Sequence, residues 1–325
     1  MMHRRHIPFR LTAVSAMVLL ANGVMAQTEE APEAEASYAP LLVQTANQDG
    51  HWTPGYDGRV QLGLGYTSDD NFMFGQYNGL SEDGATVIGN LDWQDFSSSD
   101  SQWRVSVSNL GLDTREGLLT WKNNGKLQID LGFDSQIQVR NNTGETPFRG
   151  SSSPLRLPDD WVTGSTTGDF SQLASSLHQF DRELERDKLF AGFKLNFSDN
   201  WRLDSSLSYE EKQGTSDTAG AMYVDASSGD AAMLPRPVDY RTTEFDLGLA
   251  YTGGKLNIEG RLDYSDFDNK DDILVWENPY RSRYPDSAGG LGQAPDNEQL
   301  QGRITGQYIF TSSARFQFDG SYAVA

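Results

Sequence analysis

Apolar and polar side chains alternate along residues 243–268, in two runs separated by a Gly-Gly turn. Apolar residues fill every second position of residues 245–251, and apolar or small residues do so again at residues 256–264. A period of two is the signature of a β-strand, because successive side chains point to opposite faces of a sheet. Glycine suits the tight turn between two such runs. The pattern therefore predicts a β-hairpin.

The length of this hairpin bears on the class of protein. Strands in soluble sheets run roughly 5–6 residues, whereas strands that cross a membrane need about 9–11. Both arms reach the longer figure. About eleven segments show such a pattern, at residues 57–67, 85–93, 102–110, 115–122, 126–134, 189–197, 201–210, 243–251, 255–268, 300–310 and 316–322.

The connections between these segments are unequal. Short turns are predicted at residues 123–125, 198–200, 252–254 and 311–313. Long loops are predicted between them at residues 141–186, with a short helix at 170–185, and at 213–239 and 269–297. Short periplasmic turns and long external loops are typical of outer-membrane barrels. The predicted fold is all-β, an antiparallel up-and-down transmembrane β-barrel.

The C-terminus bears on the completeness of the barrel. The sequence stops at Ala325, in or just after a strand. Backbone groups in lipid must all be hydrogen-bonded, so a half sheet with two free edges is untenable there. We interpret residues 57–325 as the N-terminal part of a truncated barrel, either a fragment or the product of a shortened gene.

Aromatic residues support the membrane interpretation. They occur on the apolar parity near strand ends, where an interfacial girdle places amphipathic rings. The alternative is a soluble β-sandwich in which aromatic residues are ordinary strand formers. The residues concerned are Trp201, Tyr209, Tyr251, Tyr264, Tyr308 and Tyr322.

The N-terminus resembles a secretory signal. Residues 1–26 have a basic start, an apolar stretch at 11–20 and a small residue, Ala26, before a cleavage point. A transmembrane anchor is the alternative, but the apolar stretch is short. Residues 27–56 are rich in Glu, Ala, Pro and Gln and predict a flexible periplasmic segment.

The net charge argues against a nucleic-acid partner. Residues 1–26 hold three arginines and no acidic residue, so their removal changes the net charge from -20 to -23. Nucleic-acid phosphates need a basic surface, so we expect no nucleic-acid partner.

The residue inventory gives little support to catalysis. There is no cysteine, which excludes disulfides and covalent c-type haem attachment. The four histidines are scattered, and no nucleophile elbow or dinucleotide loop is present. Acidic residues gather at 266–272, where a calcium site is conceivable, but Lys270 breaks the spacing and a solvated loop is the better interpretation. We expect no enzyme, no catalytic residue, no metal and no bound cofactor.

The two parities predict two environments. Residues expected to face the lumen are Lys188, Lys194, Arg202, Asp204, Glu244, Asp246, Glu259, Arg261, Asp263 and Arg303. Residues expected to face lipid are Phe193, Leu195, Leu207, Leu247, Leu249, Ile258, Leu262 and Ile304. A polar lining of both signs would suit a wet channel, or a sheath around a protein held inside.

Several segments resemble the MtrB/PioB family of decahaem-associated outer-membrane proteins. They lie in family order over most of the chain: FMFGQYNGL (72–80), SYEEKQGT (208–215), LPRPVDYRTTEFDLGLAY (234–251), LVWENPY (274–280) and APDNE (294–298). Some members carry a Cys-x-x-Cys near the mature N-terminus. This chain has none, so a role of that motif does not transfer.

The resemblance implies a function. It implies a barrel of about twice this many strands that sheathes a periplasm-facing multihaem cytochrome, usually with an external cytochrome docked on it. The barrel itself would carry no haem. The alternative is a porin-like diffusion channel, and an outer-membrane enzyme is the least supported hypothesis for want of a site.

Overall fold

The computed structural model describes residues 55–96, 98, 100–123, 125–150, 152–223, 229–280 and 288–325. The chain divides into two units, Met1–Gly50 and His51–Ala325, and every described residue belongs to the second. The predicted signal peptide at 1–26 lies outside the described residues, as does the predicted segment 27–56 except for its last two residues.

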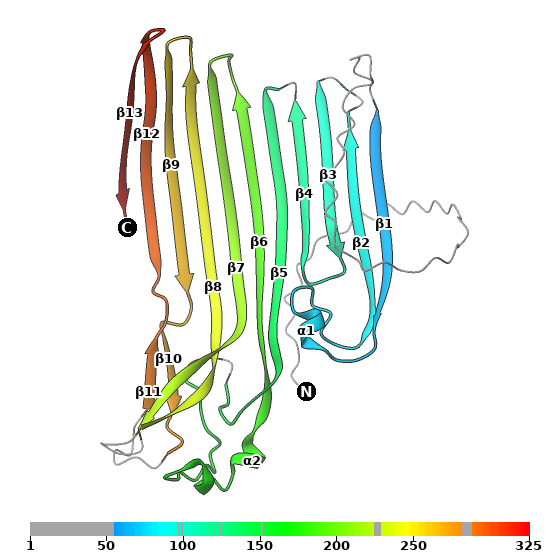
Figure 1. Cartoon of the computed structure of the whole chain (residues 1–325), viewed down its shortest axis with the longest axis vertical. Helices are drawn as coiled ribbons and strands as arrows, with labels where there is room; N and C mark the ends of the chain where they lie inside the picture. The colour runs from blue at the N-terminus through cyan, green and yellow to red at the C-terminus, as the bar shows by residue number, and fades with distance from the viewer. Residues whose placement is uncertain are drawn as a thin grey trace, which may run out of the picture. The chain divides into compact units, whose positions relative to one another are not determined.

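Eleven strands form one antiparallel sheet in which each strand pairs with its neighbours in the chain (Figure 1). The prediction of eleven long strands in an up-and-down arrangement is confirmed. The sheet is open: within the described part of the chain, its first and last strands each pair on one side only. The order is β1 (Tyr56–Thr67), β2 (Gly84–Asp95), β3 (Ser101–Leu110), β4 (Arg115–Asn123), β5 (Leu127–Thr146), β6 (His178–Asn196), β7 (Trp201–Tyr223), β8 (Gly229–Thr252), β9 (Leu256–Asn269), β12 (Asn297–Thr311) and β13 (Ala314–Val324).

The remaining elements are small. A two-stranded sheet pairs β10 (Ile273–Glu277) with β11 (Ala288–Gly292). Two single-turn helices, α1 (Phe72–Gly75) and α2 (Leu173–Ser176), lie in loops. In the part of the chain that the structure describes, neither helix has the length or apolar character needed to cross a bilayer.

Strand register gives the sheet two chemically distinct faces. One row across five strands places apolar or small residues side by side: Leu195, Leu203, Leu249, Gly260 and Ile304. Cross-strand partners share a face and chain neighbours do not. This row therefore marks one side, the apolar face. The adjacent row of Lys194, Asp204, Gly248, Arg261 and Arg303 marks the other side, the polar face.

Aromatic side chains line the apolar face at the end of the sheet where the short turns lie, here called the turn end. The rings of Trp201 and Tyr251 are 5.0 Å apart, those of Tyr308 and Phe310 are 4.9 Å apart, and Trp103 lies 5.8 Å from the Trp121 ring. Such rings prefer the boundary between hydrocarbon and water. Tyr322 departs from the predicted girdle, because it pairs with Gly302 at mid-height of the apolar face.

The apolar face also has a second boundary. Along β7 it runs from Trp201 to Tyr209, about 27 Å along the strand, close to the roughly 25 Å band of outer-membrane barrels. Beyond Tyr209 the same face carries Glu211, which accepts a 2.6 Å hydrogen bond from the tyrosine hydroxyl and pairs with Arg241 at 3.5 Å. The change from apolar to charged marks the edge of the band.

Two of the three predicted long loops are wrong in part. Strands β5 to β8 continue well past Tyr209, so residues 141–146 and 178–186 belong to strands rather than to a loop. Helix α2 covers only 173–176 of the predicted 170–185. Most of the predicted loop at 213–239 belongs to the paired strands β7 and β8. We call the parts of β5 to β8 beyond the Tyr209 row the extension; it lies at the lower end of Figure 1.

The two ends of the sheet differ in their connections, as predicted, but not simply as short turns against long loops. The four predicted short turns separate β4 from β5, β6 from β7, β8 from β9 and β12 from β13. At the opposite end, the connection at 111–114 is also short, and the predicted loop 269–297 contains the β10–β11 hairpin. The two ends therefore differ chiefly in how far the hairpins project beyond the apolar band.

A small hydrophobic core closes the tip of the extension. It joins the β5–β6 loop, the β7–β8 hairpin and β10 with its flank, which are far apart in sequence. Trp276 is 4% exposed and donates a 3.1 Å hydrogen bond to the Met222 sulfur, while Phe170 packs 5.1 Å from Tyr280. We call this set the cap cluster: Phe148, Leu155, Leu157, Phe170, Met222, Leu234, Leu274, Trp276 and Tyr280.

Candidate partner-binding face of the sheet

The register separates the two predicted sets of side chains completely. One face carries Lys188, Lys194, Arg202, Asp204, Glu244, Asp246, Glu259, Arg261, Asp263 and Arg303. The other carries Phe193, Leu195, Leu207, Leu247, Leu249, Ile258, Leu262 and Ile304. Which of the two meets lumen and which meets lipid stays a prediction.

A charge cluster spans three strands at the centre of the polar face. Asp204 on β7 accepts from Arg261 on β9, Nη2 to Oδ2, at 3.0 Å, and pairs with Arg202 Nε at 3.4 Å. Arg261 Nε also donates to Glu259 Oε1 at 3.1 Å. The cluster thus joins two cations and two anions, and their charges cancel.

Glycine makes the contact across β8 possible. Gly248 lies between Asp204 and Arg261 in the same row. A Cβ at this position would lie 2.8 Å from the Asp204 Oδ2 atom. A side chain at this position would push that carboxylate aside, so the absence of one lets Asp204 reach over β8 to the guanidinium.

A second group of ion pairs lies nearer the extension. Arg186 Nη2 lies 3.4 Å from Asp134 Oδ1, and its Nη1 lies 3.8 Å from Glu210 Oε2. Lys188 Nζ reaches Glu244 Oε2 at 3.4 Å, and the Ser208 hydroxyl donates to the same oxygen at 3.0 Å. These side chains bridge β5 to β8 and are part-exposed, so each pair contributes little stability alone, about 0–1 kcal/mol.

Asp246 and Asp263 face each other directly across β8 and β9. The Ser206 hydroxyl donates to Asp246 Oδ2 at 3.3 Å. Like charges in directly opposed positions repel, so this pair is a place where the polar face would favour a cation-bearing group. No group of three or more His, Asp or Glu in the described residues is arranged to hold a metal ion.

Sequence reasoning missed several members of the polar face. Lys122 and Gln128 lie in the same row as Lys194, because β4, β5 and β6 are in register there. The alternation of Lys122 with Trp121 along its strand is the signal that identifies the lysine. Pairing across three strands is long-range information that a single segment does not contain.

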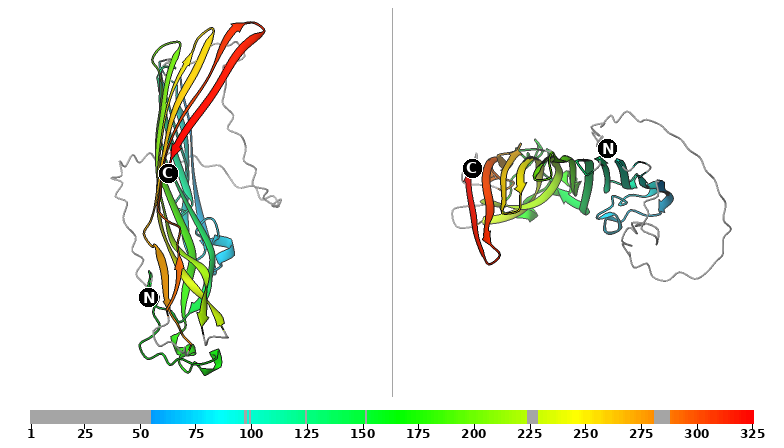
Figure 2. Two further views of the ribbon diagram at one scale, coloured as in Figure 1. Left: turned by 90° about the vertical axis from the view of Figure 1, so that its left-hand side faces the viewer. Right: turned by 90° about the horizontal axis from the view of Figure 1, so that it is seen from above.

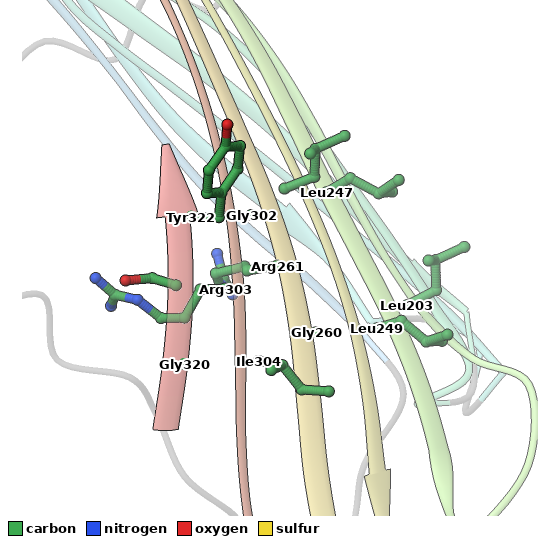
Figure 3. A pocket seen from close by; sticks show the side chains of 12 residues that line it. Leu203, Leu247, Leu249, Gly260, Arg261, Gly302, Arg303, Ile304, Gly320 and Tyr322 are labelled. Carbon is green, nitrogen blue, oxygen red and sulfur yellow. The ribbon is translucent and has the colours of Figure 1, made fainter. Parts of the chain in front are cut away.

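The apolar face has a shallow hollow of about 760 Å³ near β12 and β13. Its floor is formed by three glycines, and Figure 3 shows Gly260, Gly302 and Gly320 as bare backbone among the side chains of Leu249, Ile304 and Tyr322. Most of its side chains are apolar, and Arg261, Arg303 and Ser321 also line it. The hollow opens on the face predicted to meet lipid.

These features define a class of protein. Long antiparallel strands carry an apolar band edged by aromatic rings on one face and a charged surface on the other, which is the construction of an outer-membrane β-barrel. The chain matches the family model of the outer membrane beta-barrel porins MtrB/PioB over residues 66–325. It belongs to the MtrB/PioB family and is an outer-membrane protein.

A relative found by sequence comparison agrees with this assignment. The chain is 26% identical over 262 residues to Outer membrane protein MtrB of Shewanella baltica (strain OS185). This match covers 78% of the chain and 36% of the relative, so the chain spans about a third of the length of that protein.

Solved outer-membrane proteins show a more distant likeness. OmpT of Vibrio cholerae matches 82% of this chain and 66% of its own, at 10% identity and a TM-score of 0.32. The toluene transporter TodX of P. putida matches 83% of this chain and 73% of its own, at 12% identity and a TM-score of 0.29. Likeness at this level carries no argument about function.

Proposed function

We propose that this chain forms part of the wall of an outer-membrane barrel that sheathes and positions a multihaem c-type cytochrome, so that electrons cross the outer membrane. The short turns would lie in the periplasm and the extension outside the cell, the usual orientation of such barrels. The partner would enter from the periplasm, and a second multihaem cytochrome would dock at the external end.

The observation that carries the proposal is the polar face. Its charges are of both signs and are held in fixed positions by cross-strand pairs such as Asp204–Arg261 at 3.0 Å. A fixed pattern of donors and acceptors suits recognition of a folded protein, because complementary charges fix register and orientation. Membership of the MtrB/PioB family supports the same role.

The barrel would contribute position and insulation rather than redox chemistry. The chain contains no cysteine, so it offers no attachment point for a c-type haem. The haem would be carried by the partner, and the apolar face would hold the assembly in lipid. We therefore expect no cofactor bound by this chain and no enzymatic activity.

A porin-like diffusion channel is the second candidate. The family model describes porins, and many polar-face side chains are exposed in the absence of a partner, with Arg202 50% and Glu244 50% exposed. A water-filled lumen would solvate such groups. In that case the charges would set ion selectivity rather than contact a protein.

Co-purification distinguishes the two. The protein would be tagged and extracted from the outer membrane in mild detergent, and the eluate stained for covalently bound haem. We expect a stoichiometric haem-staining partner, and we expect the barrel freed of that partner to conduct ions far better than the complex in planar bilayers. A barrel that purifies without haem and conducts ions as isolated would establish the porin and overturn the sheath.

A further inference from the structure

A basic pocket lies on the polar face near the turn end, at a distance from the apolar hollow. It has a volume of about 380 Å³ and is lined by groups from β3 to β7. Three of its side chains are cations: Lys122 from β4, Lys194 from β6 and Arg202 from β7. The rest of the lining is formed by three amide side chains and two further residues, namely Gln102, Gln128, Asn196, Gly125 and Leu127.

Strand register brings the two lysines together. Lys122 pairs with Gln128, and Gln128 pairs with Lys194, so the lysines are two strands apart on one row. Two strand spacings amount to about 10 Å, a gap that two flexible lysine side chains can close around a small ligand. Gln102 continues the row on β3.

Among the described residues, the two lysines have no acidic partner of their own. Within the described residues, neither Lys122 nor Lys194 takes part in an ion pair, although the chain has a net charge of -20. Two carboxylates lie nearby. Asp204, opposite Lys194, is shared between Arg202 and Arg261, and Asp130 accepts from the Thr120 hydroxyl and the Gln128 amide, each at 2.7 Å.

The rim of the pocket at the turn is fixed by hydrogen bonds. Asn196 Nδ2 donates to the Gly125 carbonyl at 2.7 Å, and its backbone N–H donates to the Lys126 carbonyl at 2.7 Å. These bonds hold the β4–β5 turn against the end of β6. The cations therefore project from a rigid part of the sheet and not from a loop.

We propose that this pocket binds an anionic ligand bearing carboxylate or phosphate groups, held by Lys122 and Lys194 with help from Arg202. Lys122 and Lys194 repel each other across the hollow, and a multivalent anion between them removes that repulsion, while Arg202 is held at the edge of the hollow by Asp204. Lysine ammonium groups bind carboxylates and phosphates as mobile point charges. The amides supply directed hydrogen bonds to the remaining oxygens.

The pocket would bind an anion in either a cytochrome sheath or a porin-like channel, but the source of that anion differs between the two. If the sheath function is correct, the anionic groups belong to the protein that fills the lumen near its periplasmic entrance. Otherwise they belong to a free anion in the channel. This part of the inference rests on the proposed function, while the binding of an anion by the barrel alone does not.

The test is calorimetric titration of the complete barrel, freed of any partner, with citrate and with inorganic phosphate in low-salt buffer. We expect saturable binding that weakens with added sodium chloride. Lys122→Gln combined with Lys194→Gln should raise the dissociation constant at least tenfold. Lys122→Arg combined with Lys194→Arg keeps both charges and should bind within a few-fold of the parent.

Arg315→Gln is the matched control, since it removes an exposed cation outside the pocket. It should leave the dissociation constant unchanged, and all variants should keep the circular dichroism of the parent. Absence of saturable binding by the parent would overturn the inference. So would binding that the double glutamine variant retains in full. Either result would leave a haem-staining partner, and hence the sheath function, untouched.

A second arm identifies the source of the ligand. The barrel with its partner bound would be titrated with citrate under the same conditions. If the partner supplies the anionic groups, citrate binding should disappear in the complex and return when the partner is removed. Binding of equal strength in the complex would assign the site to a free anion instead.

Discussion

At the scale of the residue, the polar face depends on where side chains are missing as much as on where they are present. Gly248 separates Asp204 from Arg261 and permits their 3.0 Å contact. Gly132 similarly faces Phe190, whose ring would lie 2.2 Å from a Cβ there. Small residues in a strand let a neighbour fold across the backbone, an arrangement that also pins register.

This leads to a prediction for Gly248→Val. Valine favours strands, but its side chain would displace the Asp204 carboxylate and break the ion pair, whose partners are 36% and 17% exposed. We expect a loss of about 1 kcal/mol in the free energy of unfolding in lipid vesicles. The penalty should vanish in an Arg261→Gln background.

Gly260→Val is the comparison. It lies on the neighbouring strand but on the apolar face, and a Cβ there meets nothing within 4 Å. It should be neutral or stabilising. Equal effects of the two valines would show that Gly248 serves only the backbone.

Position along the strand decides the cost of a charge on the apolar face. Leu247 pairs with Leu262 at mid-height, whereas Ile258 pairs with Tyr251 in the aromatic girdle. Leu247→Arg should cost about 2–4 kcal/mol and Ile258→Arg about 0–1 kcal/mol, because the penalty falls toward the interface. Unfolding in vesicles measures both.

The polar face supplies the control for these arginines. Gln301 lies opposite Asp263, so Gln301→Arg places the same side chain beside a carboxylate at similar height. We expect it to be neutral or stabilising. A large cost at Gln301 together with a small one at Leu247 would mean that the lipid and lumen faces are assigned the wrong way round.

At the scale of the element, the strands within the apolar band were predictable and their extensions were not. Alternation is imposed where one face meets hydrocarbon, and the segments at 189–197 and 243–251 show it clearly. Beyond Tyr209 both faces carry polar groups, so β7 and β8 continue to Tyr223 and from Gly229 without that signal. Backbone pairing sustains these parts, and pairing leaves no periodic trace in a single sequence.

The same reasoning applies to the candidate site. The parity of Lys194, Arg202 and Asp204 was readable from their own strands. Their grouping with Lys122 and Gln128 required the register of β4 to β7, which only the folded sheet defines. Single residues were thus assigned to faces, while contacts such as Asp204–Arg261 were not predictable.

An ion pair outside the apolar band gives the extension a dependence on pH. Lys270 Nζ donates to Asp239 at 2.8 Å, and this hydrogen bond raises the pKa of Lys270 above its ordinary value. A raised folded-state pKa stabilises the fold below about pH 10.4, the unfolded value. That stabilisation is lost as pH rises through the folded value.

The measurement is limited proteolysis of the 270–296 connection at pH 9 and pH 11. We expect the rise in cleavage from pH 9 to pH 11 to be larger in the parent protein than in Lys270→Met, which has no ammonium to titrate. Because the lysine is exposed, the difference should be small. The same pH response in both proteins would exclude Lys270 as its source.

At the scale of the whole molecule, the second unit combines two kinds of stability. The sheet within the band would gain stability from lipid on the face predicted to meet it, while the tip of the extension has a water-excluded core of its own. Figure 2 shows the sheet curving along its width. The cap cluster lies at the tip of the extension. Residues from 148 to 280 meet in this cluster, so it holds the β5–β6 loop, the β7–β8 hairpin and β10 as one unit.

The last prediction follows from this division. Trp276 packs against Gly220 and Gly289, where a Cβ would lie 2.9 and 2.0 Å from its ring. Trp276→Ala should cost the cap cluster about 3–5 kcal/mol, enough to open it locally. Hydrogen exchange should become faster in residues 147–177 and in β10, while the strands between Trp201 and Tyr251 keep their protection. Val162→Ala, at a position 51% exposed, should change neither region. Loss of protection throughout the sheet would show that extension and band unfold as a single cooperative unit, and the cap cluster would then be part of what keeps the barrel in the membrane.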